Sequence, residues 1–142
     1  MSETIQATGA CLCGAVKVTV HKMRKDFGAC HCDMCRTWGG GPLMASDCGR
    51  QVEFEGEEHI GVYSSSDWAE RGFCKQCGTH LFYRLKEGPE YHCPVGLFPN
   101  IEGMHLKRQV FIEKKPDSYS FADDTTNMTG EELFAAHAAS AD

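Results

Sequence analysis

Apolar and polar residues alternate in several short segments of the chain. In the segment 15–21, Val16, Val18 and Val20 are separated by polar residues, which is the period of a strand with one buried face. Further short strands are expected at 43–46, 52–55, 60–64, 79–85, 91–97 and 109–113. The pattern predicts a mostly β domain.

A helical pattern is expected only near the C-terminus. Thr129 lies three residues before Glu132, which is the spacing of a capping box and predicts a helix over 131–139. The segment 30–35 is too rich in cysteine and turn-forming residues to be regular, and the glycines and proline at 39–42 mark a loop. We therefore expect no helix before the C-terminal one.

The chain length of 142 residues suits one domain with a modest core. Residues 114–124 combine a proline with acidic and hydroxyl residues and are the expected connector to the helix. The predicted organisation is one domain over 1–123, with its core at about 9–115, and a helical tail over 124–142.

The charge and the apolar content of the sequence exclude two kinds of partner, nucleic acid and membrane. The formal net charge is -6 and the chain has no run of basic residues, so the electrostatic attraction that holds proteins on nucleic acid is missing. The sequence has no stretch of about 18 apolar residues to span a membrane. Its N-terminus lacks the apolar core of a signal peptide. We expect a soluble cytoplasmic protein that binds neither nucleic acid nor membrane.

Seven of the nine cysteines fall into three tight clusters. They are Cys11 and Cys13, then Cys30, Cys32 and Cys35, and finally Cys74 and Cys77. Disulfides are rare in a reducing cytosol, so such clusters favour metal binding over a disulfide framework. A structural zinc site takes four protein ligands, whereas a catalytic one takes three and leaves a position open. One site of each kind would use all seven clustered cysteines.

The spacing leaves the pairing of the clusters open. Glycine follows the second cysteine in both Cys11–Gly14 and Cys74–Gly78, where a turn around a metal needs a positive φ. These two knuckles could share one metal. Alternatively, Cys32 and Cys35 could join the second knuckle, as in zinc ribbons. Cys48 and Cys93 have no neighbouring ligand and are expected to be buried thiols, although Cys93 would become a fourth ligand if its strand lay beside a three-cysteine site.

Several motifs occur together in one order. They are GACLCGAV at 9–16, CHCDMC at 30–35 followed by Arg36, Gly39 and Gly40, YSSS at 63–66, and RGFCKQCGTHLFY at 71–83. From about Gly9 to about Asp123, this order and spacing resemble the glutathione-dependent formaldehyde-activating enzyme family, which includes centromere protein V-like proteins.

The resemblance implies a fold, a pairing of the cysteines and an activity. The fold would be a β-tent of short antiparallel sheets with zinc knuckles. The structural zinc would be held by Cys11, Cys13, Cys74 and Cys77, and the second, exposed zinc by Cys30, Cys32 and Cys35. The activity would be that of a carbon–sulfur lyase joining glutathione, as co-substrate, to formaldehyde to give S-hydroxymethylglutathione. The chain departs from common family patterns at 96–99, Gln109 and 117–118, which bears on the substrate pocket and not on the two zinc ions.

The chemistry of the three-cysteine site suggests roles for nearby residues. Three thiolates weaken zinc as a Lewis acid, so the site would orient a glutathione thiolate beside a small aldehyde more than it would polarise the aldehyde. His31 would be either a proton donor or a side chain turned away from the metal. Arg71 would either hold a glutathione carboxylate or brace the second knuckle. The competing function is a non-catalytic module in which both zinc ions are structural or in which a bound thiol is only sensed or carried.

Overall fold

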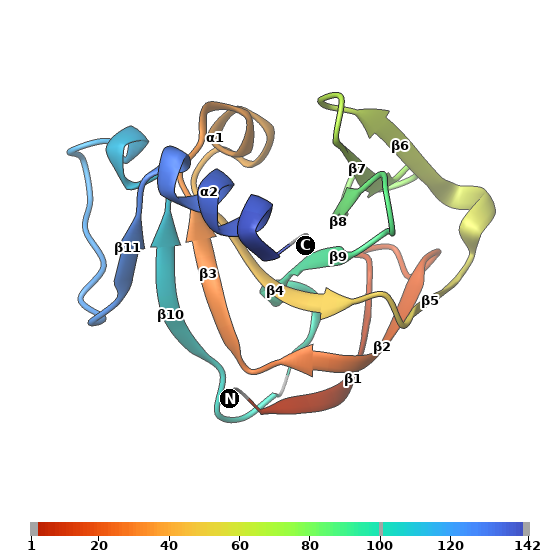
Figure 1. Ribbon diagram of the computed structural model, residues 1–142. Coiled ribbons are helices and arrows are strands. Elements are labelled where there is room, and N and C mark those ends of the chain that lie inside the picture. Colours follow the sequence, from red (N-terminus) through yellow and green to blue (C-terminus); the bar gives the residue numbers. More distant parts are fainter. Residues whose placement is uncertain (1–2, 100, 141–142) are drawn as a thin grey trace. The chain divides into compact units, whose positions relative to one another are not determined.

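The computed structural model describes residues 3–99 and 101–140 and is mostly β, as the sequence predicts (Figure 1). Its residues form two compact units. The first unit takes its residues from 1–26 and 45–104, and the second from 27–44 and 105–142. No helix among the described residues is long and apolar enough to cross a membrane.

One sheet of the first unit contains three antiparallel strands. They are β1 (Thr4–Ala10), β2 (Lys17–Arg24) and β5 (Val52–Glu55), in the order β1-β2-β5. Val16, Val18 and Val20 are at most 1% exposed. The alternation that predicts this strand therefore identifies its buried face correctly.

A second run of antiparallel strands completes the first unit. It contains β4 (Leu43–Gly49), β9 (Tyr91–Pro94), β8 (His80–Leu85), β7 (Ala69–Cys74) and β6 (Ile60–Ser64), neighbours in that order. Phe82 of β8 lies in the core, with its ring centroid 5.5 Å from that of Phe54. A Cβ atom at Gly72 would lie 2.2 Å from the Phe82 ring. The close approach of β7 and β8 here therefore requires glycine.

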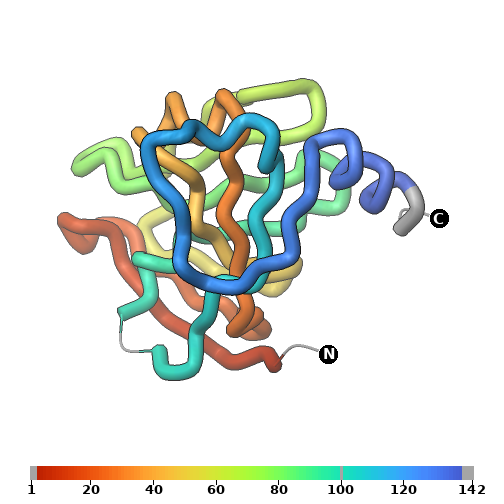
Figure 2. Tube along the Cα trace, turned by 90° about the vertical axis from the view of Figure 1, so that its left-hand side faces the viewer, coloured from red at the N-terminus to blue at the C-terminus, as the bar shows by residue number. Residues whose placement is uncertain are grey.

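The second unit contains the end of the chain. Its strands β3 (Asp26–Cys30), β10 (His105–Val110) and β11 (Thr126–Met128) follow the order β11-β10-β3. Its helices are α1 (Asp33–Gly39) and α2 (Gly130–Ser140). Strand β11 pairs with β10 in parallel. A parallel neighbour needs a long return connection, and Figure 2 shows the loop after residue 114 leading back toward β10.

Short 3₁₀ turns separate several of these strands. They are η1 (Glu57–His59), η2 (Val95–Leu97) and η3 (Ile112–Lys114). The expected strand at 109–113 is misplaced, because β10 ends at Val110 and Phe111 has a φ of 55°, in the left-handed region. A residue in that conformation ends the extended backbone and leads into η3.

The C-terminal helix is confirmed together with its capping box. The Thr129 amide donates to Glu132 Oε1 at 2.8 Å, and the Glu132 amide donates to Thr129 Oγ1 at 3.1 Å. The prediction that no helix precedes it is wrong, because α1 begins within the cysteine cluster. Cys32 is its N-cap and accepts a hydrogen bond from the Cys35 amide, while Gly40 ends it with a φ of 83°. Capping by a cysteine is outside the usual sequence signals for a helix start.

Candidate metal centres

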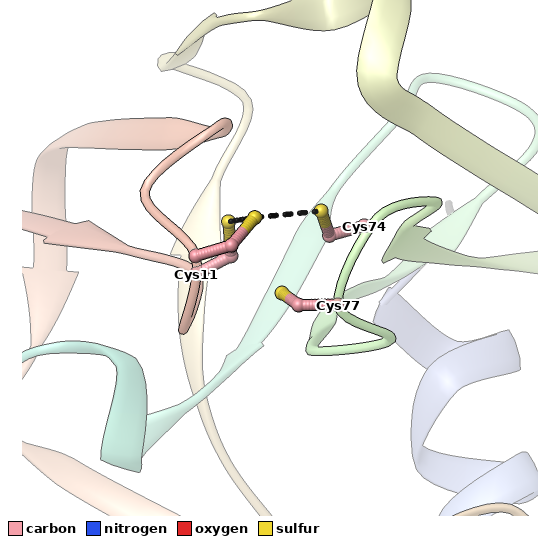
Figure 3. A group of neighbouring side chains, drawn as sticks. Cys11, Cys74 and Cys77 are labelled. Carbon is pink, nitrogen blue, oxygen red and sulfur yellow. Dashed lines mark hydrogen bonds between the residues drawn. The ribbon is translucent and has the colours of Figure 1, made fainter.

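Four cysteine sulfurs converge from two distant turns of the first unit. Cys11 and Cys13 follow β1, while Cys74 ends β7 and Cys77 lies in the next turn. The four sulfur atoms lie within 4.8 Å of one another, and Figure 3 shows Cys11, Cys74 and Cys77 with their side chains pointing toward one another. We call these residues the four-cysteine group.

The sulfur separations in this group fit a tetrahedral zinc site. Cys13 Sγ lies 3.7 Å from Cys11 Sγ and 3.8 Å from Cys74 Sγ. A tetrahedron with zinc–sulfur bonds of about 2.3 Å has sulfur atoms about 3.8 Å apart. The four-cysteine group therefore has the donor atoms and the spacing of a closed, structural zinc site.

Glycine shapes both turns of the four-cysteine group. Gly14 has a φ of 81° and Gly78 a φ of 79°, and each amide donates to the carbonyl of the first cysteine of its turn. The positive φ predicted after each second ligand is confirmed. The Val16 amide also donates to Cys11 Sγ at 3.3 Å. Such hydrogen bonds favour the thiolate form that binds metal.

Thr79 connects the two turns. Its hydroxyl accepts a hydrogen bond from the Leu12 amide at 3.0 Å and lies 3.1 Å from Cys77 Sγ. Since the hydroxyl oxygen is the acceptor for Leu12, its proton is available to Cys77. This hydrogen bond is the largest cause that lowers the pKa of the Cys77 thiol to about 5. The sequence pattern includes Thr79 in the strand expected at 79–85, whereas β8 begins at His80; its position two residues after a ligand was a usable signal for its role.

The remaining three clustered cysteines form a group in the second unit. Cys30 ends β3, Cys32 caps α1 and Cys35 lies in the first turn of α1, with their three sulfur atoms within 4.8 Å of one another. In the described part of the chain, no histidine, cysteine, aspartate or glutamate completes this group as a fourth ligand. We call it the three-cysteine group.

The electrostatics of the three-cysteine group favour a bound cation. Hydrogen bonding to Cys32 and Cys35, together with burial, raises the pKa of the Cys30 thiol. Three thiolates held this close repel one another, and a divalent cation would remove that penalty. Sulfur ligands suit zinc. The group therefore fits a zinc ion with one coordination position left for another ligand.

His31, between two of these ligands, is fully buried and has protein partners on its ring. Its Nδ1 lies 2.9 Å from the Tyr119 hydroxyl, and its Nε2 lies 2.9 Å from Gln109 Oε1. The ring is not part of the three-cysteine group. This arrangement agrees with a side chain turned away from the metal ligands.

Three other residues considered in the sequence lie in the first unit: Arg71, Cys48 and Cys93. Arg71 on β7 is only 2% exposed, and its guanidinium carbon lies 5.2 Å from the centre of the Tyr83 ring. Cys48 and Cys93 are both fully buried in the core, which confirms that they are buried thiols. Hydrogen bonding to Cys48 and burial raise the pKa of the Cys93 thiol. Cys93 belongs to neither group of potential ligands among the described residues.

A groove also lies beside the four-cysteine group. Its volume is about 950 Å³, and its lining includes Cys11, Leu12 and Thr79 together with Lys17 and Glu55. Lys17 and Glu55 are directly opposite each other on β2 and β5. The groove is therefore lined by one basic and one acidic side chain, Lys17 and Glu55, and borders the four-cysteine group.

Comparisons with known proteins agree with these features. A Schizosaccharomyces pombe protein named as an uncharacterised lyase is 38% identical over 126 residues, which cover 88% of this chain and 92% of that protein. A Halomonas elongata protein, provisionally named a glutathione-dependent formaldehyde-activating enzyme, is 28% identical over 123 residues, covering 77% of this chain and 76% of that protein.

A solved structure and a family model extend the comparison. The crystal structure of a Rhodobacter sphaeroides protein matches with a TM-score of 0.58 and 25% identity, covering 67% of this chain and 90% of that one. The family model described as glutathione-dependent formaldehyde-activating enzyme matches residues 6–114, a span that contains all seven clustered cysteines. The chain therefore belongs to the glutathione-dependent formaldehyde-activating enzyme family.

Proposed function

We propose that this protein is a carbon–sulfur lyase that joins the thiol of glutathione to formaldehyde or another small aldehyde at the three-cysteine group. One observation carries the proposal: this group offers three thiol ligands and, among the described residues, no fourth. Family membership and the lyase name of the fission yeast relative support it. The four-cysteine group would hold a second, structural zinc ion, so that each chain carries two.

The proposed reaction needs no redox partner. The thiol loses its proton, and a sulfur lone pair forms the new bond to the carbonyl carbon. The π electrons of the carbonyl move to its oxygen, which then takes up a proton. The product is a hydroxymethyl thioether, and every atom of the thiol and the aldehyde is retained.

Cys30, Cys32 and Cys35 would hold the zinc ion of this site. A zinc ion with three thiolate ligands supplies an open coordination position where a bound thiol is stabilised in its deprotonated form. The chain fixes this ligand set through a strand end and a helix start, since Cys30 ends β3, Cys32 caps α1 and Cys35 lies in the first turn of α1. The protein contribution is thus the orientation of a nucleophile.

Charged residues of α1 and η3 support an anionic thiol substrate. Arg36 Nη2 lies 2.7 Å from Asp33 Oδ1, and Lys114 Nζ lies 3.6 Å from Asp33 Oδ2. Two cations share one carboxylate here, which leaves an excess of positive charge. Glutathione carries two carboxylates, and we propose that Arg36 and Lys114 attract one of them.

Arg71 belongs to the first unit and the three-cysteine group to the second, and the expectation that Arg71 holds a glutathione carboxylate stays a proposal. The Arg71 guanidinium is shielded from water at 2% exposure, and a hydrogen bond between charged groups is stronger where water is excluded. Arg71→Lys would keep the charge and lose the planar pair of donors. We expect a higher KM for glutathione with an unchanged zinc content. A normal KM would instead assign Arg71 to bracing β7.

The decisive experiment measures the exchange between formaldehyde and its glutathione adduct by ¹³C NMR exchange spectroscopy. Wild-type protein should raise the exchange rate above that of the reagents alone, and Cys32→Ser should abolish the gain. Cys48→Ala is the matched control, because Cys48 is a buried cysteine outside both metal groups. If wild-type protein binds zinc and glutathione without accelerating exchange for any small aldehyde, the protein is a non-catalytic zinc module.

A further inference from the structure

The His31 side chain joins the ligand loop, residues 30–35 with the three cysteines, to two segments far along the sequence. His31 stands between Cys30 and Cys32, is fully buried, and meets Gln109 of β10 and Tyr119 of the loop before β11. Its partners are 78 and 88 residues away in the sequence. A buried imidazole needs partners for both nitrogens, and these residues provide them.

The hydrogen-bond network fixes how His31 is held. Gln109 Nε2 donates to Thr125 Oγ1 at 2.9 Å, and Thr125 Oγ1 donates to Asn127 Oδ1 at 2.7 Å. Since the amide nitrogen is used in this way, Gln109 Oε1 is the acceptor for His31 Nε2–H. Nδ1 of the neutral ring then accepts from the Tyr119 hydroxyl. Both ring nitrogens are thus committed to positions set by β10, β11 and the loop between them.

The backbone of His31 is held as well. Its amide donates to the Val110 carbonyl at 3.1 Å, and its carbonyl accepts from Arg36 Nε at 3.0 Å. With the two ring contacts, the residue is fixed at four points. Because Cys30 and Cys32 are its direct neighbours in sequence, these contacts also limit where their sulfur atoms can lie.

The loop that carries Tyr119 is packed rather than free. Lys115 Nζ donates to the Tyr119 carbonyl and lies 4.9 Å from the centre of the Tyr119 ring. Phe121 places its ring 5.8 Å from Tyr119 and 6.1 Å from His31, measured between centroids. These contacts therefore hold the Tyr119 ring and its hydroxyl in position.

We infer that His31, Gln109 and Tyr119 form a positioning bracket that holds the three-cysteine group ready for its metal. These residues are not metal ligands. They fix the ligand loop, so retention of the metal depends on a segment that supplies none of the ligands. The inference rests on the proposed function only in taking zinc as the metal of this group, and it does not require lyase activity.

The test follows zinc transfer from the full-length, zinc-loaded protein to a chromophoric chelator. Wild-type protein should release two zinc ions in two phases. The fast phase should come from the three-cysteine group and the slow phase from the four-cysteine group. Tyr119→Phe and Gln109→Met each remove bracket hydrogen bonds at nearly constant shape. Each should accelerate the fast phase roughly tenfold, the scale of effects from residues that orient metal ligands, and leave the slow phase unchanged.

Tyr91→Phe is the matched control. Its hydroxyl accepts a hydrogen bond from Arg84 Nη1 at 3.1 Å in the first unit, so the substitution removes a comparable contact outside the bracket. It should leave the fast phase unchanged. A cobalt-loaded sample provides a second readout, since a looser three-cysteine group should change the cobalt–thiolate absorption bands in the bracket variants alone.

Three results would overturn the inference. The first is a fast phase unchanged in both bracket variants. The second is an equal acceleration of both phases, which would indicate general destabilisation. The third is a wild-type protein that releases zinc only in the slow phase, since the bracket would then position no metal. Catalysis is not measured here, so failure of the lyase proposal and failure of the bracket give different outcomes.

Discussion

The two cysteine groups differ in how far apart in sequence their ligands lie. In the four-cysteine group, Cys13 and Cys74 are 61 residues apart and their sulfurs are 3.8 Å apart. In the three-cysteine group, all ligands come from residues 30–35. A metal in the first group would close a long loop of chain, whereas a metal in the second would join only one loop to itself. The first group is therefore suited to stability and the second to chemistry.

The largest expected effect comes from breaking the four-cysteine group. Cys74 is fully buried, and Cys74→Ser should prevent folding, because structural zinc sites contribute roughly 10 kcal/mol or more against a total stability of about 5–15 kcal/mol. Soluble yield and the circular dichroism spectrum test this expectation. A soluble Cys74→Ser protein with a native melting temperature would remove the distinction between the groups.

The matching substitution in the three-cysteine group is Cys32→Ser. Cys32 caps α1, and serine is a favourable N-cap residue, so the helix should persist while a metal ligand is lost. We expect one zinc ion per chain instead of two, a retained fold and no acceleration of adduct exchange. Metal analysis and a thermal melt check this. Collapse as complete as that of Cys74→Ser would contradict the comparison.

A smaller effect is expected at Thr79, which bonds to both turns of the four-cysteine group. Thr79→Val should lower the free energy of unfolding by about 1 kcal/mol or somewhat more, since it removes a hydrogen bond and leaves the Leu12 amide without this acceptor. It should also accelerate the slow phase of zinc release. Thr79→Ser keeps the hydroxyl and is the control. Equal stability of the two variants would exclude the hydroxyl as the link.

The smallest effect concerns substrate attraction near the three-cysteine group. Lys114 is about half exposed at 47%, so Lys114→Ala should raise the KM for glutathione only twofold to fivefold, roughly the range of exposed ion pairs, with kcat unchanged. Lys107→Ala, an exposed lysine on β10, is the control. The same change in KM for both lysines would indicate net charge alone rather than a contact.

Local patterns predict the strands better than the connections between them. The valines at 16, 18 and 20 mark one buried face, and the strand expected at 60–64 matches β6 in its limits. The parallel strand β11 was not anticipated, because its three residues have no alternation to detect. Helix α1 was missed for a related reason, since its N-cap is a cysteine.

For the candidate sites as well, the sequence predicts the local features and misses the contacts between distant segments. Clustering and glycine positions predict metal ligands, but spacing alone left the partner of Cys74 and Cys77 open, and the family resemblance supplied it. The convergence of Cys11, Cys13, Cys74 and Cys77 agrees with that pairing. Gln109 stood out only as a departure from the family pattern and Tyr119 carried no signal, because contacts with His31 across 78 and 88 residues are set by the fold. The roles of the three-cysteine group and Arg71 in catalysis stay predictions.

The hydrogen bond that caps α1 would change in strength when metal binds at the three-cysteine group. The Cys35 amide donates to Cys32 Sγ at 3.3 Å, so one sulfur atom would serve both the helix and the metal. A neutral thiol is a weak acceptor, whereas a metal-bound thiolate is a stronger one. Loading the site should therefore slow hydrogen exchange of this single amide, and its protection would record the metal status of each molecule.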